Sequence, residues 1–117
     1  MSWTVVLHEA FDLEYEALPM AVQDAIVAVS TLLMELGPLL GRPHVDTLVG
    51  SRHANMKEMR FRADNGAWRV AFAFDPERQA ILLVAGDKAG VAQKRFYKAL
   101  ITKADSRFDA HLETLKE

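Results

Sequence analysis

The sequence predicts a single α+β domain, in which a hairpin of two helices packs on a mainly antiparallel, twisted sheet and a further helix follows. Two observations predict this class. Apolar residues recur at helical spacing near both ends of the chain, whereas the middle holds three strand-like runs separated by short turns. The length of 117 residues fits one domain, residues 1–117, because a smaller core would not offset the entropy of the chain.

The first third of the chain predicts one strand and two helices. Residues 4–8 form a short β-branched run, which is typical of a strand, and a helical patch follows from Ala10 to about Leu18. A second helix should begin at Pro19, because a proline in the first turn loses no hydrogen bond, and should end at Gly37-Pro38. Its apolar residues recur at helical spacing: Val22, Ile26, Val29, Leu33 and Leu36.

The middle of the chain predicts a long loop and then an antiparallel meander. Residues 39–55 hold several glycines and prolines and no sustained period, so we expect a loop, and its length hints at function. Strands are expected over residues 56–62, 67–75 and 79–86, because turn sequences separate them. The last strand is apolar on both faces and should lie inside the sheet.

A final helix is expected from about Val91 to Leu115. It carries an i, i+4 stripe that we interpret as core packing: Phe96, Leu100, Ala104, Phe108 and Leu112. The predicted order of elements is therefore β-α-α-β-β-β-α.

Composition excludes several classes of protein. The chain has no cysteine, so it can form neither disulfides nor a thiolate metal site. The sequence has four histidines, His8, His44, His53 and His111. They lie far apart without the spacing of paired metal ligands, so we expect no metal and no cofactor. The start of the chain does not resemble a signal peptide, and we expect no apolar stretch to approach the roughly 20 residues that a bilayer needs, so the predicted location is cytoplasmic.

Charge is distributed unevenly along the sequence. The net charge is −2, yet residues 1–50 carry seven acids against one base, whereas residues 52–103 carry eleven bases against five acids. A basic face of this kind would neutralise the phosphates of a nucleic acid. The alternative is that these charges are scattered over a solvated surface.

One constellation could carry chemistry. Arg60, Arg62 and Arg69 are expected on polar faces of neighbouring strands, Asp87 and Lys88 follow the last strand, and the next helix begins with Lys94, Arg95 and Tyr97. RNA cleavage needs a base for the 2′-hydroxyl, cations for the charge that grows on the phosphate, and a proton for the leaving 5′-oxygen. Guanidinium groups suit the second task, because their fork matches phosphate oxygens.

The general base remains open at this point. Asp87, Glu58 and His53 are the candidates, in that order. A purely structural interpretation is that Glu58 pairs with an arginine across the sheet while Arg62 and Arg78 are solvated edge charges.

Ordered blocks along the chain resemble one known family. Residues 41–48 (Gly-Arg-Pro-His-Val-Asp-Thr-Leu), 50–53 (Gly-Ser-Arg-His) and 56–60 (Met-Lys-Glu-Met-Arg) resemble a block of RelE/ParE-superfamily toxins, specifically of the HigB-like, phage-related branch. The likeness continues through residues 71–76, 83–88, 94–97 and 104–112, so it covers nearly the whole chain.

The resemblance implies a RelE-like (microbial RNase-like) fold and the toxin of a type II toxin–antitoxin system. It implies a metal-independent endoribonuclease that cleaves mRNA in the ribosomal A site, inhibits translation and is neutralised by a helix-turn-helix antitoxin encoded beside it. Carried over by position, the catalytic residues are Arg60, Arg69, Asp87 and Lys88. We expect the surrounding residues to bind RNA: Arg52, His53, Lys57, Arg62, Lys94, Arg95 and Tyr97.

Two other functions are compatible with the same fold, because function belongs to the site and not to the fold. One is a ParE-like inhibitor of DNA gyrase, and the other is a non-catalytic protein that only binds an antitoxin. The paired arginines favour RNA cleavage, and the open question of the base leaves room for the others.

Overall fold

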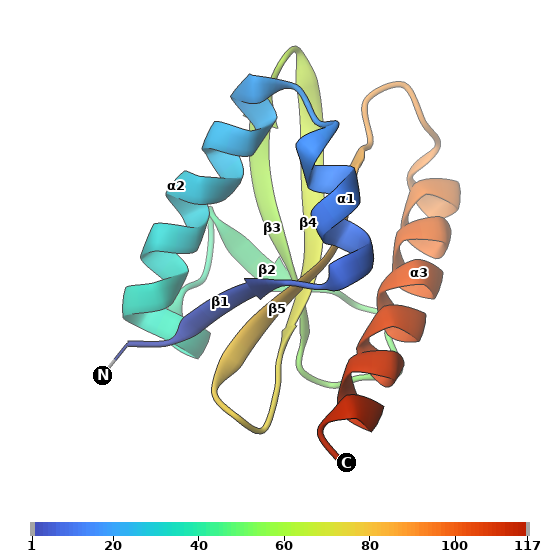
Figure 1. Ribbon diagram of the computed structural model, residues 1–117. Coiled ribbons are helices and arrows are strands. Elements are labelled where there is room, and N and C mark those ends of the chain that lie inside the picture. The colour runs from blue at the N-terminus through green and yellow to red at the C-terminus, as the bar shows by residue number, and fades with distance from the viewer. Residues whose placement is uncertain (1, 117) are drawn as a thin grey trace.

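The computed structural model describes residues 2–116, and it confirms the predicted α+β class (Figure 1). The elements follow the predicted order with one added strand and a short 3-10 turn. They are β1 (Thr4–Leu7), α1 (Glu9–Glu16), α2 (Met20–Leu36), η1 (Gly37–Leu39), β2 (Val45–Thr47), β3 (Met56–Ala63), β4 (Gly66–Phe74), β5 (Gln79–Asp87) and α3 (Gln93–Thr114).

The strands form one five-stranded sheet in the order β1-β5-β4-β3-β2. β1 runs parallel to β5, and every other pair is antiparallel, which confirms the meander from β3 to β5. The expected interior position of β5 is also confirmed, because it lies between β1 and β4. A bulge interrupts the pairing of β4 with β5: Ala71 faces Val84 and Phe72 faces Leu82, so Leu83 is the extra residue.

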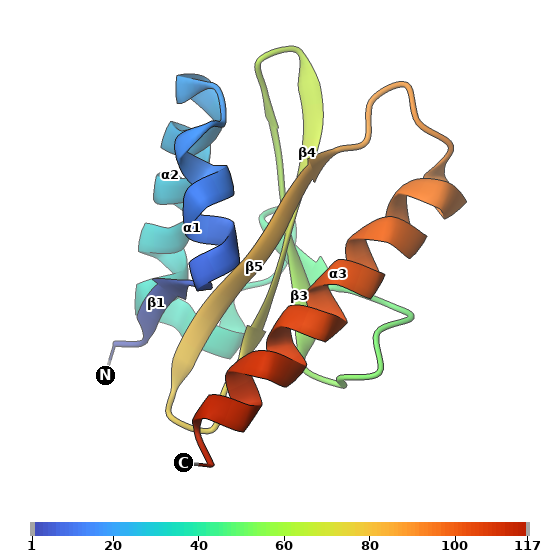
Figure 2. The same ribbon diagram turned by 45° about the vertical axis from the view of Figure 1, so that its right-hand side comes forward.

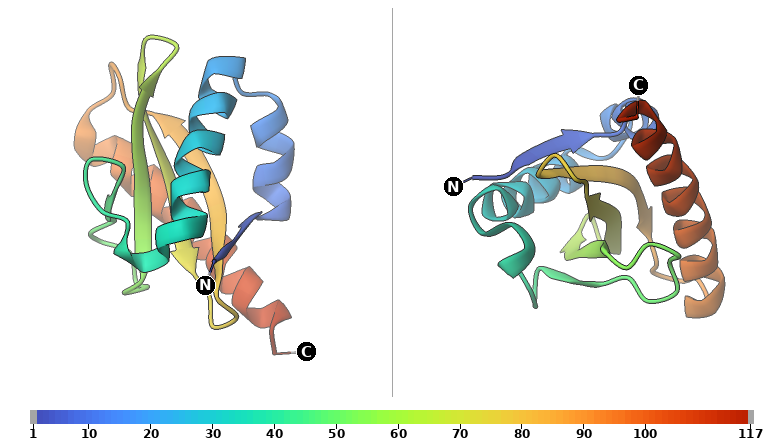
Figure 3. Two further views of the ribbon diagram at one scale, coloured as in Figure 1. Left: turned by 90° about the vertical axis from the view of Figure 1, so that its left-hand side faces the viewer. Right: turned by 90° about the horizontal axis from the view of Figure 1, so that it is seen from below.

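Helices cover both faces of the sheet. α1 and α2 pack on one face and α3 packs on the opposite face (Figure 2), and the view from below in Figure 3 shows the sheet between them. Each interface has its own apolar core. Phe11, Ile26 and Phe72 belong to the first, whereas Phe96 and Phe108 of α3 belong to the second. The predicted α3 stripe is therefore core packing.

The expectation of a structureless loop over residues 39–55 is wrong in part. Val45–Thr47 forms the edge strand β2, which pairs antiparallel with β3 and buries Val45 in the first core. Three residues are too few to show an alternating pattern, so no periodicity indicates this strand. The rest of the loop is anchored on α3, because the Ser51 hydroxyl and the Arg52 backbone N–H both donate to the buried Asp105 carboxylate.

The expectation that no apolar stretch approaches membrane-spanning length also needs correction. Residues 20–39, which include α2, have a mean hydropathy of 1.4 and are long enough to cross a bilayer. In this fold α2 instead lies on the sheet, where it buries Val22, Ile26, Val29 and Leu33. Length and composition alone do not separate such a core helix from a membrane span.

Gly37 ends α2 in a backbone conformation that other residues rarely adopt, with φ of 52° and ψ of −132°. A Cβ at this position would lie 2.2 Å from the indole nitrogen of Trp3. We predict that Gly37→Ala lowers the free energy of unfolding by at least about 1 kcal/mol, because it adds backbone strain and a clash. Urea unfolding followed by circular dichroism measures this effect.

Gly41→Ala is the matched control, since a Cβ there would meet nothing within 4 Å. We expect it to change stability by no more than about 0.5 kcal/mol. Equal stabilities of the two variants would contradict the role assigned to Gly37.

Candidate active site

The candidate site lies where α3 crosses strands β3 and β4. Arg60 of β3 and Arg69 of β4 stand directly opposite each other in the sheet. Because side chains alternate along a strand, Glu58 shares their face, and this is the face that α3 covers. Tyr97 lies in the first turns of α3, and its hydroxyl group contacts Glu58 and Arg69.

A single hydrogen-bonded network joins these four side chains, which we call the sheet cluster. The Tyr97 hydroxyl donates to Glu58 Oε1 at 2.8 Å, and Arg60 Nη1 donates to Glu58 Oε2 at 3.0 Å. Arg69 Nε donates to the Tyr97 oxygen at 3.2 Å and lies 3.7 Å from Glu58 Oε1. The Glu58 carboxylate is thus the acceptor at the centre of the network.

Burial separates the roles of the two arginines. The side chains of Glu58 and Arg69 are only 6% and 8% exposed, whereas that of Arg60 is 23% exposed. Arg60 is therefore the more accessible of the two arginines and lines the hollow described below, whereas Arg69 is buried against Tyr97 and Glu58. Burial raises the pKa of Tyr97, and its hydrogen bond to Glu58 raises that pKa further. The phenol consequently stays protonated at neutral pH and can act as a donor.

The sheet cluster opens into a hollow of about 760 Å³ between β2, β3 and the start of α3. Glu58, Arg60 and Tyr97 form part of its wall. The other lining residues come from the loop before β3 and from α3: Arg42, Asp46, Thr47, Leu48, Val49, Gln93, Lys94 and Lys98. Four of the lining residues are bases and two are acids, so the hollow favours an anion. Its volume is within the usual range of small-molecule sites.

One ion pair forms the rim of this hollow. Arg42 Nη2 lies 2.8 Å from Asp46 Oδ2, and both side chains are well exposed. A hydrogen bond from the Thr47 backbone and the Arg42 guanidinium hold the pKa of Asp46 below its ordinary value. Asp46 therefore remains ionised and paired, and we do not regard it as a proton carrier.

Some of the predicted site residues are brought together and others are not. Arg60, Arg69, Tyr97 and Lys94 converge on the hollow or on the sheet cluster beneath it. Glu58, the second candidate for the base, stands at the centre of the cluster. The first candidate does not reach it.

Asp87 points to the opposite face of the sheet. Arg69 is paired with Gly86, so Asp87 stands beside Trp68, and alternation directs its side chain away from α3. Its carboxylate accepts hydrogen bonds from the backbone N–H groups of Ala67 and Ala89, at 3.0 and 2.9 Å. This arrangement stabilises the end of β5.

Lys88 follows β5 and is tied through its backbone, whose N–H donates to the Ala67 carbonyl at 2.9 Å. Within residues 2–116, no hydrogen bond or ion pair joins its amino group to the sheet cluster. The sequence correctly predicted that Asp87 and Lys88 follow the last strand. It did not predict the register with β4, and a register shift of one residue reverses the face on which a side chain lies.

Two predicted RNA-binding residues, Arg52 and His53, contact the C-terminal half of α3 from the loop before β3. Arg52 forms an ion pair with Asp109, and His53 Nε2 lies 2.8 Å from the same carboxylate. The His53 ring also packs edge-on against Phe108. These contacts hold the loop before β3 against α3, away from the hollow.

Three further predicted RNA-binding residues, Lys57, Arg62 and Arg95, lie outside the hollow. Lys57 precedes Glu58 and therefore faces the α2 side, where its amino group lies 3.4 Å from Thr47 Oγ1. Arg62 is exposed two positions beyond Arg60 on the same face, as a flanking cation. Arg95 is exposed on a different side of α3 and lines another hollow.

Sequence reasoning missed part of the lining. Lys98 follows Lys94 by one helical turn, and the i, i+4 spacing in a helix could have revealed it. Asp46 and Thr47 enter through β2, which the sequence did not predict. Within residues 2–116, no three histidine, aspartate or glutamate side chains are grouped so that they could hold a metal ion.

Comparison with known proteins gives the family. Residues 14–109 match the model of the family described as phage-derived protein Gp49-like. The chain belongs to this Gp49-like family. It is 52% identical over 80 residues to "Putative toxin HigB3" of Mycobacterium tuberculosis, which covers 68% of this chain and 67% of that protein.

A second relative extends this likeness. The chain is 45% identical over 95 residues to "Putative toxin HigB2" of Mycobacterium tuberculosis, across 80% of this chain but only 47% of that protein. The chain thus spans about half the length of this curated relative. These matches confirm the predicted resemblance to HigB-like, phage-related proteins.

Solved structures confirm the RelE-like fold of this Gp49-like chain. A mutant of the Escherichia coli toxin RelE in the free state superposes with a TM-score of 0.62 at 14% identity, covering 88% of this chain and 97% of that one. The archaeal RelE–RelB complex from Pyrococcus horikoshii superposes with a TM-score of 0.55 at 18% identity, covering 78% and 100%. At these identities the likeness establishes the fold alone.

The sheet cluster predicts a measurable titration. In a Tyr15→Phe background, which leaves Tyr97 as the single tyrosine, the phenol should titrate above its ordinary pKa of about 10. Glu58→Gln should lower that pKa, because it removes a negative charge and weakens the acceptor next to the phenol. Ultraviolet absorbance of tyrosinate against pH measures both values.

Glu77→Gln, an exposed change in the turn after β4, is the control and should leave the titration of Tyr97 unchanged. An unchanged Tyr97 titration in Glu58→Gln would mean that the two side chains do not interact in solution.

Proposed function

We propose that this chain is the toxin of a type II toxin–antitoxin system and cleaves mRNA on the ribosome. The observation that carries this proposal is the sheet cluster, in which a carboxylate, two guanidinium groups and a neutral phenol meet at the wall of a cationic hollow. These are the groups that cleavage of an RNA phosphodiester requires. Membership of the Gp49-like family supports the proposal.

In the proposed reaction Glu58 acts as the general base. Its carboxylate takes the proton of the 2′-hydroxyl, the 2′-oxygen attacks phosphorus, and the bond from phosphorus to the 5′-oxygen breaks. Arg60 neutralises the charge that grows on the phosphate oxygens, because it is the guanidinium of the cluster that reaches solvent.

Tyr97 and Arg69 complete the proposed mechanism. Tyr97 gives its proton to the leaving 5′-oxygen and recovers one from Glu58, through the hydrogen bond that joins them. Arg69 is a positioning residue: it is buried, and it holds both the phenol and the carboxylate in place. Lys94 and Lys98 at the wall of the hollow attract the RNA backbone.

The partners follow from the same proposal. We propose a helix-turn-helix antitoxin as the neutralising partner, mRNA on the ribosome as the substrate, and the cytoplasm as the location where both are met. The solved RelE–RelB complex, a toxin-fold chain with its partner, supports the pairing. A gyrase inhibitor or a binding-only protein needs no RNA-cleaving residues, so loss of mRNA cleavage on substitution of the sheet cluster separates these functions from the proposed one.

The test is cleavage of ribosome-bound mRNA by single variants. Arg60→Ala and Glu58→Gln should each lower the cleavage rate by about 100- to 1000-fold, by analogy with the loss of one transition-state donor. Tyr97→Phe should lower it if the phenol transfers the proton. Arg69→Ala should lower both the rate and the melting temperature, because it leaves Glu58 less completely paired.

Arg62→Ala is the matched control, since it removes one exposed guanidinium from the same face of β3 without touching the cluster. It should keep the rate per bound substrate. Arg78 is unsuitable as a control, because its guanidinium lies 4.4 Å over the Trp3 ring. Wild-type cleavage by folded Arg60→Ala and Glu58→Gln proteins would remove the cluster from the mechanism, and gyrase inhibition without cleavage would favour the ParE-like alternative.

A further inference from the structure

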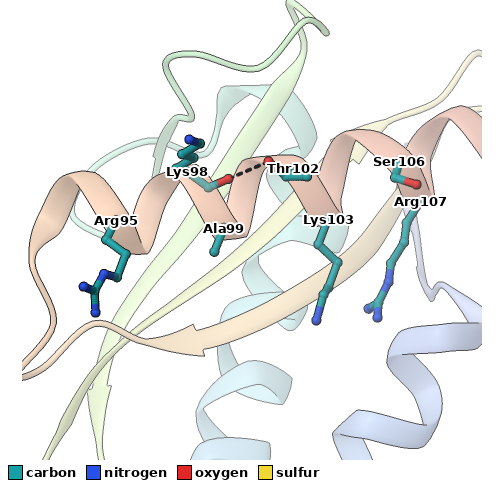
Figure 4. Close-up of a pocket in the computed structure, with 7 residues that line it drawn as sticks. All are labelled: Arg95, Lys98, Ala99, Thr102, Lys103, Ser106 and Arg107. Carbon is teal, nitrogen blue, oxygen red and sulfur yellow. Dashed lines mark hydrogen bonds between the residues drawn. The ribbon is translucent and has the colours of Figure 1, made fainter.

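A second hollow lies along α3, on a different side from the candidate active site. Its lining includes Arg95, Ala99, Lys103 and Arg107, which follow one another at i, i+4 spacing and so form one stripe of the helix. Figure 4 shows the side chains of Arg95, Lys103 and Arg107 directed to the same side of α3, whereas Lys98 points away from them. The hollow has a volume of about 570 Å³.

An adjoining hollow of about 260 Å³ connects this stripe to the sheet. It shares Arg95, Ala99 and Lys103 with the first hollow. Its other lining residues come from β5, from the loop before α3 and from the apolar side of α3: Val84, Ala85, Gly86, Val91, Phe96 and Leu100. Together the two hollows form a groove with an apolar floor and a cationic wall, which we call the α3–β5 groove.

The β5 strand presents a free edge to this groove. β1 pairs only with residues 79–82 of β5, so within residues 2–116 no strand lies on that side of residues 83–87. At the start of this free edge the Leu83 carbonyl accepts a hydrogen bond from Arg107 Nη1 at 2.7 Å. A side chain thus supplies the donor that a neighbouring strand would supply.

The cationic wall lacks internal partners near the centre of the groove. Arg107 is bound to both carboxylate oxygens of Glu14, at 2.8 and 2.7 Å. Arg95 and Lys103, by contrast, form no ion pair within residues 2–116. Arg95 and Lys103 therefore stand beside the apolar floor without a direct ion-pair partner, and Glu14, which Arg107 binds, is the acid that interacts electrostatically with Lys103.

We propose that the α3–β5 groove binds an extended acidic segment of a partner protein, which adds to the sheet beside residues 83–87 of β5. Backbone hydrogen bonds to the free edge give the segment its place, as in other cases of strand addition. Acidic side chains of the segment pair with Arg95 and Lys103, and an apolar side chain between them covers the floor at Phe96.

The dimensions of the groove define the spacing within the segment. Arg95 and Lys103 are eight residues apart in a helix, which corresponds to roughly 12 Å. Side chains four residues apart in an extended strand lie on one side and are separated by roughly 13 Å. The groove thus matches a segment of the form acid-x-apolar-x-acid, in which the apolar residue falls midway between the two acids.

The apolar floor distinguishes this ligand from RNA. A nucleic-acid backbone is polar along its whole length and would leave the exposed apolar residues of this lining, Val91 and Ala99, without an apolar partner. A peptide covers such a floor and pairs with the cations at the same time. This proposal does not depend on RNA cleavage, and its test measures binding only, so its failure would leave the proposed function standing.

The test uses the full chain and a fluorescein-labelled peptide of sequence Thr-Glu-Thr-Val-Thr-Glu-Thr, with a Lys-for-Glu peptide as its control. We expect the glutamate peptide to bind at least about tenfold more tightly. The double variant Arg95→Glu/Lys103→Glu should lose this affinity by about tenfold and prefer the lysine peptide, because the charges are exchanged. Lys116→Glu, a charge reversal just beyond α3, is the control variant.

Hydrogen exchange locates the bound peptide. Saturation with the glutamate peptide should slow exchange of the amides in residues 83–87 and leave the free β2 edge unaffected. Several results would overturn the proposal: no preference between the two peptides, binding that the double variant retains, or protection outside β5. Binding of a ten-nucleotide oligouridylate that the double variant loses, without any peptide binding, would identify the groove as an RNA surface and overturn it as well.

Discussion

The buried carboxylate of Glu58 is the constraint on which the site depends. A charge so far from solvent is tolerated only when it is paired and hydrogen-bonded, and removal of one partner from such a pair costs about 3 to 5 kcal/mol. Glu58 therefore needs Arg60 and Arg69 on the sheet and Tyr97 from α3. Because one of the three partners comes from the helix, the ionic network also fixes where α3 crosses the sheet.

The short distance between α3 and the sheet at this crossing depends on a glycine of β5. Gly86 stands opposite Arg69, and a Cβ there would lie 2.9 Å from the Phe96 ring. Phe96 can therefore pack on the sheet, and the next residue, Tyr97, reaches Glu58. Apolar packing and the polar network position the same helical turn, so the phenol is held within hydrogen-bond distance of the carboxylate without support from a ligand.

Much of this arrangement could be predicted from the sequence. Hydrophobic periodicity predicted the helices, and the turn sequences predicted the meander. The alternation along two neighbouring strands predicted polar faces for Arg60 and Arg69, which the structure places opposite each other. The position of Asp87 could not be predicted, because a shift of one residue reverses the face that a side chain occupies. Nor could the burial of Glu58, since nothing local shows that α3 covers the polar face of β3 rather than leaving it to water.

The α3–β5 groove and the sheet cluster meet at two successive residues of α3. Phe96 lines the groove, Tyr97 belongs to the cluster, and their rings lie 5.2 Å apart with nearly perpendicular planes. A segment seated against Phe96 would touch the helical turn that carries the phenol. A ligand changes a distant group only if it binds two arrangements of the protein unequally. Here the two arrangements would be two positions of the helical turn that carries Phe96 and Tyr97. Apolar packing of Phe96 and the hydrogen bond from Tyr97 to Glu58 both hold this turn, so occupation of the groove and the geometry of the proposed proton donor depend on the same contacts.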